Sequence, residues 1–262
     1  MGQSRRYAVR CRTGFVLVLA CLAGSTADVW AAGAGALTFG GDLTAVTDYI
    51  FRGVSQNDGR PAAQFDLHAG TNDGLFAGVW GSTLNSREPR ANFELDVYVA
   101  KRFALSSAWS ATLTASDYAY LDRPETPADD YQEVSVALAY LDTWNVSLSA
   151  SPNAVHYWRG FRLGRYFAYD ADVTIQWPVF GSVLGAAGRT FLTAGAGYYY
   201  LTGPSLPQWG TQGYPYGNAG LALERNAWRL DVAYYVADRQ AERLFPYSFS
   251  NNRIAATLSR RF

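Results

Sequence analysis

Acidic side chains recur at alternate positions in several segments, and they are the residues best suited to act on ions. Glu94 and Asp96 are separated by one apolar residue, and so are Asp170 and Asp172. The candidate pore-lining residues, expected on one common face, are Asp42, Asp66, Glu94, Asp96, Glu133, Asp170, Asp172, Asp231 and Arg102, with Asp48, His68, Glu224, Arg253 and Arg261 beside them. Carboxylates around a narrow aqueous passage attract cations and repel anions. A weak cation preference is therefore expected; the equal alternative is an interior in which the acids pair with arginines and conduct nothing.

Arg52 stands where a predicted strand ends, and Gly53 follows it. Its functional interpretation is a pore-mouth arginine or a partner for an acidic side chain. The five residues that follow at 56–60 (QNDGR) have the composition of a loop. A purely architectural role for Arg52 in a turn is therefore kept as the alternative.

Catalytic and metal-binding patterns are weak in this chain. Its two histidines, His68 and His156, have no companion set of ligands for a metal ion. We find no nucleophile elbow and no serine beside either histidine along a strand. We therefore expect no catalytic residue, no cofactor and no metal, and a protein that is not an enzyme, although residues on different strands could still converge.

The elements that must position these residues are β-strands, because apolar and polar side chains alternate with a period of two. Val134, Val136 and Leu138, for example, alternate with Glu133 and Ser135. No helical period competes with this alternation. About twelve strands are predicted, near 37–50, 61–71, 74–84, 92–103, 107–118, 131–141, 144–151, 165–177, 189–201, 215–225, 227–237 and 252–262. Each is long enough to cross a membrane when tilted.

The connections between the predicted strands alternate in length. Tight turns are expected at 72–73, 104–106, 142–143 and 225–226, and longer polar or proline-rich loops at 51–60, 85–91, 119–130, 152–164, 202–214 and 238–251. Short periplasmic turns and long external loops are typical of outer-membrane barrels. The connection at 178–188 is longer than this pattern predicts, so either a strand is misplaced there or that hairpin extends beyond the membrane.

The carboxy-terminal strand supports the same fold class. It alternates through Ile254, Ala256 and Leu258 and ends on Phe262, which is typical of the strand that barrel-assembly machinery recognises. Arg260 departs from that signature, and snorkelling at the interface would accommodate it. The sequence therefore predicts an all-β protein, a closed antiparallel transmembrane β-barrel of about twelve strands.

The amino terminus predicts export. Four arginines, an apolar run over 14–23 and small residues up to Ala32 have the layout of a cleavable signal peptide. Cleavage after Ala27 or after Ala31 fits the small side chains there; the later site assigns the signal peptide to 1–31 and the barrel to 32–262. A twin-arginine signal and a lipoprotein processing site at Cys21 remain alternatives. Both cysteines, Cys11 and Cys21, lie in the segment expected to be removed.

Composition excludes several classes of protein. The remainder after 1–31 holds 18 basic and 21 acidic side chains, so no nucleic-acid partner is expected. No apolar run is long enough for a membrane-spanning helix. Aromatic residues make up 15% of the chain, which suits tyrosine and tryptophan belts at bilayer interfaces.

Residues 47–103 resemble a known family. The residues that match are Asp48-Tyr49, the run from Phe51 to Gln56 (FRGVSQ), Pro61-Ala62, Gly74, the run from Ala77 to Ser82 (AGVWGS), and Glu94, Asp96 and Tyr98. This pattern resembles the TorF-type porins of proteobacteria, also called the Gcw family, in which an Asn commonly stands where this chain has Thr83. The resemblance implies an exported outer-membrane barrel of about this length.

Together these observations predict a porin-like protein of the bacterial outer membrane that lets small polar or ionic solutes diffuse passively. The expected partners are outer-membrane lipid, the barrel-assembly machinery and small solutes; oligomeric state, solute and the openness of the lumen stay undetermined. The alternatives are a structural or adhesive barrel with a filled lumen, and an outer-membrane hydrolase that acts on lipid.

Overall fold

The computed structural model describes residues 37–84, 91–121, 129–141, 143–158, 161–179, 188–203, 212–245 and 252–262. The predicted signal peptide lies outside these residues. The elements are β1 (Leu37–Val46), β2 (Ile50–Phe51), β3 (Val54–Ser55), β4 (Ala62–Thr71), β5 (Leu75–Thr83), β6 (Phe93–Ala104), β7 (Trp109–Leu121), β8 (Tyr131–Tyr140), β9 (Trp144–Trp158), β10 (Phe161–Val179), β11 (Gly188–Leu201), β12 (Gly213–Arg225), β13 (Trp228–Ala237), α2 (Ala241–Leu244) and β14 (Arg253–Arg261). No helix among them is long and apolar enough to cross a membrane.

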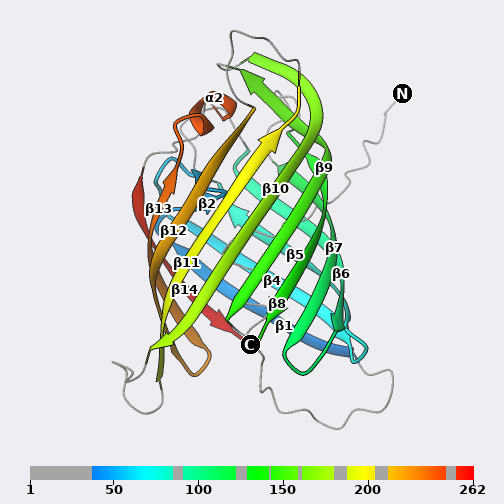
Figure 1. Cartoon of the computed structure of the whole chain (residues 1–262), viewed down its shortest axis with the longest axis vertical. Coiled ribbons are helices and arrows are strands. Elements are labelled where there is room, and N and C mark those ends of the chain that lie inside the picture. Colours follow the sequence, from blue (N-terminus) through cyan, green and yellow to red (C-terminus); the bar gives the residue numbers. More distant parts are fainter. Residues whose placement is uncertain are drawn as a thin grey trace, which may run out of the picture.

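Twelve of these strands form a closed antiparallel barrel, and they cross it obliquely (Figure 1). Each strand pairs with its sequence neighbour, and β1 closes the ring by pairing with both β4 and β14, from Asp42 opposite Arg261 to Val46 opposite Thr257. Closure leaves no sheet edge with unpaired backbone groups, which a bilayer requires. The predicted fold class and the count of twelve barrel strands are confirmed.

The two ends of the barrel differ. We call the end that holds the short connections β4–β5, β6–β7, β8–β9 and β12–β13 the turn end, and the opposite end the loop end. The predicted loop at 152–164 is wrong, because β9 continues to Trp158 and β10 begins at Phe161. At the turn end, β10 reaches Val179 and β11 begins at Gly188, so both strands continue slightly into the long connection predicted at 178–188. Residues 180–187 lie outside the described part.

The outward face of the barrel is apolar, as the alternation predicts. Exposed side chains on it include Leu43, Leu113, Val136, Leu148 and Leu221. Exposed aromatic side chains gather at the turn end, namely Phe103, Trp109, Tyr140, Trp144, Trp177 and Trp228, and a second group lies toward the loop end, namely Phe167, Tyr169, Tyr198 and Tyr200. An apolar band between two aromatic belts is the surface of a membrane barrel.

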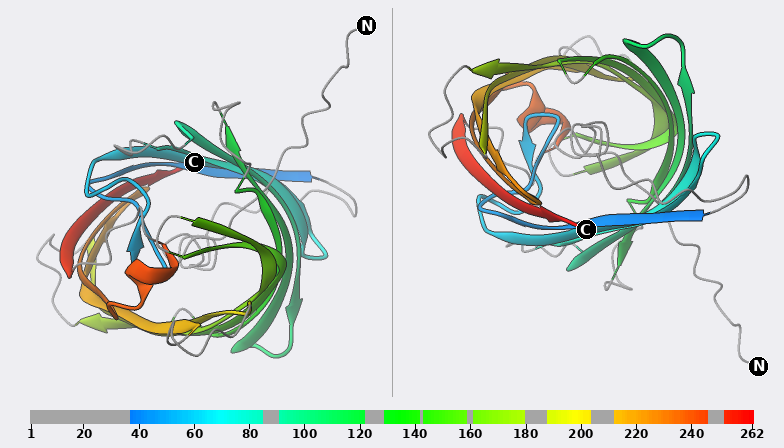
Figure 2. Two further views of the ribbon diagram at one scale, coloured as in Figure 1. Left: turned by 90° about the horizontal axis from the view of Figure 1, so that it is seen from above. Right: turned by 90° about the horizontal axis from the view of Figure 1, so that it is seen from below.

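The interior of the loop end is packed. A hairpin built from β2 and β3 lies inside the ring, together with α2 (Figure 2). Val54 of the hairpin and Leu244 of α2 belong to one buried apolar cluster with Leu201, Tyr214 and Tyr216 of the wall. Further clusters bury Phe51 against the wall residue Trp80, and Ile50 against Tyr235. The hairpin is therefore held from three sides.

Candidate functional site: the barrel interior

The predicted acidic residues all belong to the inward face of the barrel. Asp42, Asp66, Glu94, Asp96, Glu133 and Asp170 are buried, and Asp172 and Asp231 are half-buried. Asp48, which lies in the β1–β2 connection, and Glu224 are also buried. Arg102 follows the same alternation but is exposed at the turn end of β6, so it lies at the rim of the barrel. The prediction that Arg102 lines the enclosed interior is therefore wrong.

The inward hairpin is the main feature that the sequence did not reveal. Its backbone returns on itself through Gln56 N, which donates to Tyr49 O at 2.7 Å. The Ser55 hydroxyl donates to Asp48 Oδ1 at 2.5 Å, and Gly59 N donates to the same hydroxyl at 3.0 Å. Arg253 of β14 then donates to Asp48 Oδ2 at 2.6 Å. These bonds fix the base of the hairpin to the barrel wall.

The tip of the hairpin requires glycine. Arg52 and Gly53 both have left-handed backbones, with φ of 49° and 76°. A Cβ on Gly53 would lie 2.7 Å from Tyr216 Cβ and 2.8 Å from Ala237 Cβ, closer than carbon atoms approach. Gly53 therefore lets the tip turn and lets it approach the wall.

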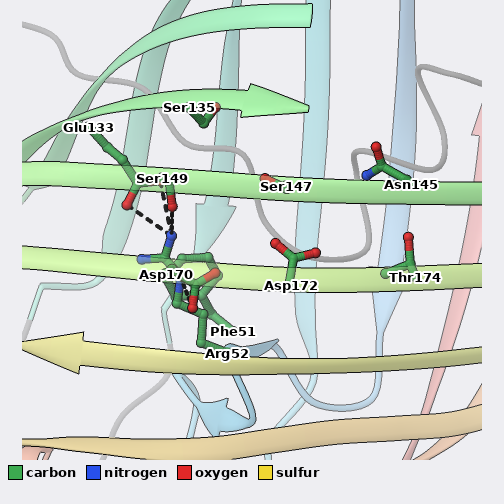
Figure 3. Close-up of a pocket in the computed structure, with 10 residues that line it drawn as sticks. All are labelled: Phe51, Arg52, Glu133, Ser135, Asn145, Ser147, Ser149, Asp170, Asp172 and Thr174. Carbon is green, nitrogen blue, oxygen red and sulfur yellow. Dashed lines mark hydrogen bonds and ion pairs between the residues drawn. The ribbon is translucent and has the colours of Figure 1, made fainter. Parts of the chain in front are cut away.

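Arg52 is the central cation of the interior. Its side chain is 7% exposed, and its Nη2 donates to Glu133 Oε1 and Oε2 at 3.0 and 2.9 Å and to Ser149 Oγ at 2.8 Å (Figure 3). Its Nε lies 3.3 Å from Asp170 Oδ1. The guanidinium also lies 5.3 Å from the centre of the Tyr199 ring. One arginine from the hairpin thus bridges acidic residues of β8 and β10.

These contacts decide between the two interpretations of Arg52. The segment 51–60 was expected as an external loop with Arg52 at the pore mouth, and that placement is wrong, because Arg52 is buried inside the barrel. The alternative expectation, a partner for an acidic side chain, is what the geometry shows. The physical reason is that Glu133 and Asp170 face inward and need a buried counter-charge.

Tyrosines complete this cluster of charges. The Tyr118 hydroxyl donates to Glu133 Oε1 at 2.9 Å, and the Tyr216 hydroxyl lies 2.9 Å from both oxygens of Asp170. Charge-assisted hydrogen bonds of this kind are stronger than those between neutral groups. Each carboxylate that Arg52 neutralises therefore has further donors, and we call Arg52, Glu133, Asp170, Tyr118 and Tyr216 the Arg52 cluster.

A small cavity of about 30 Å³ lies beside the Arg52 cluster. Besides residues of that cluster, its walls are Phe51, Ser135, Asn145, Ser147, Ser149, Asp172 and Thr174 (Figure 3). All but Phe51 come from the inward faces of β8, β9 and β10. The cavity is large enough for one water molecule or a bare small ion.

A second charge cluster lies at the turn end around Arg229. Its guanidinium donates to Glu224 Oε1 at 2.7 Å, to Asp231 at 2.7 and 2.8 Å, and to Gln176 Oε1 at 2.7 Å. Arg189 donates to the other oxygen of Glu224 at 2.6 Å. We call this set the Arg229 cluster. Sequence analysis missed Arg229, although it alternates with Leu230 on the same face as Asp231, and that spacing was the signal.

The histidines have ordinary structural partners. His68 Nδ1 lies 2.5 Å from Asp66 Oδ1, and the Tyr98 hydroxyl donates to Asp66 Oδ2 at 2.8 Å. His156 Nδ1 lies 3.1 Å from the Thr202 carbonyl oxygen. Within the described residues, neither ring forms a hydrogen bond with a serine hydroxyl, and no group of three or more His, Cys, Asp or Glu side chains is placed to hold a metal ion.

Comparison with known proteins places this barrel in a family. A model described as a bacterial protein of unknown function (Gcw_chp) matches residues 30–200, more than half of the chain. The chain belongs to the Gcw_chp family. The predicted resemblance to the Gcw family is thereby confirmed, and the match extends beyond the segment 47–103 that carried it. Curated protein sequences give no match.

Several solved structures are similar to this chain. The NanC porin covers 84% of this chain with 97% of its own, at 11% identity and a TM-score of 0.51. The KdgM porin covers 85% with 98% of its own, at 11% identity and a TM-score of 0.47, and LpxR from Salmonella typhimurium covers 85% with 99%, at 11% identity and a TM-score of 0.44. At this identity the likeness to the NanC porin shows the fold alone.

Proposed function

We propose that this member of the Gcw_chp family is a porin-like protein of the bacterial outer membrane that passes small polar solutes, with a preference for cations. Outer-membrane lipid would contact its apolar outer face, and barrel-assembly machinery would insert it. The closed ring and the two aromatic belts support a membrane location. Small hydrated solutes would meet the polar inner face.

The inward face of β8, β9 and β10 is the observation that carries this proposal. Its side chains are small or polar from the loop end to the turn end: Glu133, Ser135, Ala137 and Ala139 on β8, Ser151, Ser149, Ser147 and Asn145 on β9, and Asp170, Asp172, Thr174 and Gln176 on β10. No bulky apolar side chain stands among these twelve. A barrel that only had to be filled would pack such a wall with larger apolar residues.

Charge gives the expected selectivity. Arg52 neutralises one charge of the Glu133 and Asp170 pair, and Asp172 adds another carboxylate two positions along β10. At the turn end Arg229 is matched by Glu224 and Asp231. The wall therefore retains an excess of acid, which raises the local concentration of cations and lowers that of anions.

The test is electrical recording of the refolded barrel in a planar lipid bilayer. We expect discrete conductance steps, and under a KCl gradient a reversal potential displaced toward the potassium equilibrium value. A protein-free bilayer is the baseline control. Current equal to that baseline would contradict an open passage through the barrel. A reversal potential displaced toward the chloride equilibrium value would contradict the cation preference.

A barrel with a filled lumen is the second candidate, and the packed loop end is the observation that favours it. The hairpin and α2 bury Val54, Leu244 and Phe51 against two parts of the wall. A structural or adhesive barrel of this kind would give baseline current. It would also give no swelling of proteoliposomes in isosmotic solutions of small sugars or amino acids.

A further inference from the structure

The cavity beside the Arg52 cluster carries an inference that deepens the proposed function. On the lumen side of β9 and β10, Asn145 is opposite Thr174 in the strand register, and Ser147 is opposite Asp172. Opposed residues in a sheet have Cβ atoms about 5 Å apart, and residues two positions along a strand are separated by about 7 Å. These four oxygen-bearing side chains therefore lie next to one another on one patch of the wall, and all four line the cavity.

Two of the four side chains present buried oxygen atoms that need a partner. Asn145 and Thr174 are each 5% exposed. Asn145 Oδ1 and Thr174 Oγ1 have no hydrogen-bond partner among the described residues. Burying an amide or hydroxyl oxygen without a partner is unfavourable, because the atom loses its hydrogen bonds to water and gains none in return. Figure 3 shows both side chains on the wall beside Asp172.

The charge at this place is also unmatched. Arg52 lies on one side with its ion pairs to Glu133 and Asp170, and Arg229 reaches Gln176 on the other side with its own ion pairs to Glu224 and Asp231. Among the described residues, Asp172 makes no salt bridge to an arginine or lysine. Arg52 also lines the cavity, but its guanidinium is already paired with Glu133 and Asp170, so the carboxylate of Asp172 is left in excess beside neutral oxygen atoms.

From this geometry we propose that Asp172, Asn145, Thr174 and Ser147 form a binding site for a small monovalent cation of the sodium or potassium class. One carboxylate with an amide oxygen and two hydroxyls supplies only hard oxygen ligands. A single unpaired carboxylate matches the charge of one monovalent ion and would leave a calcium ion half-neutralised, and magnesium retains several waters, for which about 30 Å³ leaves no room. The role of this site, binding a cation transiently as it crosses the barrel, rests on the proposed function, whereas cation binding itself does not.

Thallium(I) is the probe, because it replaces sodium and potassium and scatters anomalously. Crystals of the refolded barrel, soaked in thallium(I) acetate, are expected to show an anomalous peak between Asp172 and Thr174. The peak should vanish in Asp172→Asn and weaken several-fold in Thr174→Val. The matched control is Thr257→Val, which removes another buried hydroxyl from the lumen face, on β14, and should leave the peak unchanged.

Three results would overturn the site: no peak in the cavity, a peak that survives Asp172→Asn, or a manganese(II) peak there in crystals where thallium gives none. The conductance test fails or succeeds separately. If the barrel binds thallium at Asp172 but passes no current, the cation site is supported and the proposed passage is contradicted. If the barrel conducts but shows no such peak, the passage is supported and the cation site is contradicted.

Discussion

The Arg52 side chain reaches across the lumen from the hairpin to Glu133 of β8, and a single nitrogen, Nη2, contacts both carboxylate oxygens at 3.0 and 2.9 Å. The residues are far apart in sequence, and both are buried. This ion pair therefore fastens an inward-folded segment to the wall that the proposed passage follows. Whatever displaces Arg52 should both destabilise the barrel and widen its interior.

Replacing Arg52 with Met tests that role. The change leaves Glu133 and Asp170 buried without their counter-charge, a loss of about 3–5 kcal/mol in the free energy of unfolding. Urea unfolding in detergent measures this loss, and single-channel recording should show a larger conductance than the parent because the hairpin is released. Arg60→Met is the control, since it removes a charge from the same connection. Equal effects of the two variants would contradict a specific fastening by Arg52.

Gly53→Ala tests the hairpin without a change of charge. The added methyl group would lie 2.7 Å from Tyr216 Cβ, and the backbone has a φ of 76°, which non-glycine residues adopt at a cost of about 1–2 kcal/mol. Gly59→Ala is the matched control, because Gly59 has a φ of 73° but its nearest contact is the flexible end of Arg253 at 3.2 Å. We expect Gly53→Ala to lose about 1–3 kcal/mol more in urea unfolding. Equal losses would show that the tip does not touch the wall.

Much of the fold follows from one property of the sequence. A strand between lipid and water must alternate, so Glu133 and Asp170 are assigned to the interior by counting from Val134 or Val173. The same count places Arg229 inside beside Asp231, and it was available without a structure. Arg102 shows the limit of counting, because alternation gives the face of a strand and not the depth at which the barrel ends.

The hairpin could not be predicted in this way. Residues 56–60 have the composition of any exposed turn, and nothing local reveals that Arg52 meets carboxylates from β8 and β10. The extension of β9 and β10 has the same origin. Pro152 and Asn153 signal a loop, yet Ala154 and Ala168 pack with the apolar cluster around Val54 and Leu244. Tertiary packing in the loop end outweighs local propensity at both places.

Arg229→Gln tests the charge of the lumen. The substitution leaves Glu224 and Asp231 without the cation that contacts them at 2.7 Å, so the interior becomes more acidic. The ratio of potassium to chloride permeability, taken from the reversal potential, should rise several-fold. Arg225→Gln removes the same charge from an exposed turn-end residue and should leave the ratio unchanged. Equal shifts would mean that selectivity arises at the rim.

Asp73 in the β4–β5 turn gives a pH prediction. A hydrogen bond from Lys101, followed by one from Thr71, lowers the pKa of Asp73 from 3.8 to about 2. Because the folded pKa is depressed, the contribution of this carboxylate to stability is present above about pH 4 and is lost as the pH falls toward about 2. Carbon-13 NMR of the Asp73 carboxyl in the refolded barrel should give the low midpoint. Lys101→Met should return it toward 3.8, and Thr71→Val should move it less; an unchanged midpoint in Lys101→Met would contradict this pairing.

Two tryptophans on opposite faces of the wall test the orientation on which the membrane assignment depends. Trp80 is 1% exposed and packs inside against Tyr49, with ring centres 5.6 Å apart, whereas Trp228 is 49% exposed at the turn end, where Arg260 lies 5.7 Å from its ring. In barrels that retain only one of these tryptophans, brominated lipid should quench the fluorescence of Trp228 strongly and leave that of Trp80 nearly unchanged. Quenching requires contact between the indole ring and the lipid chains or their upper segments. Equal quenching of both would mean that the apolar face does not meet lipid, and the assignment of Asp172 and its neighbours to an aqueous interior would fail with it.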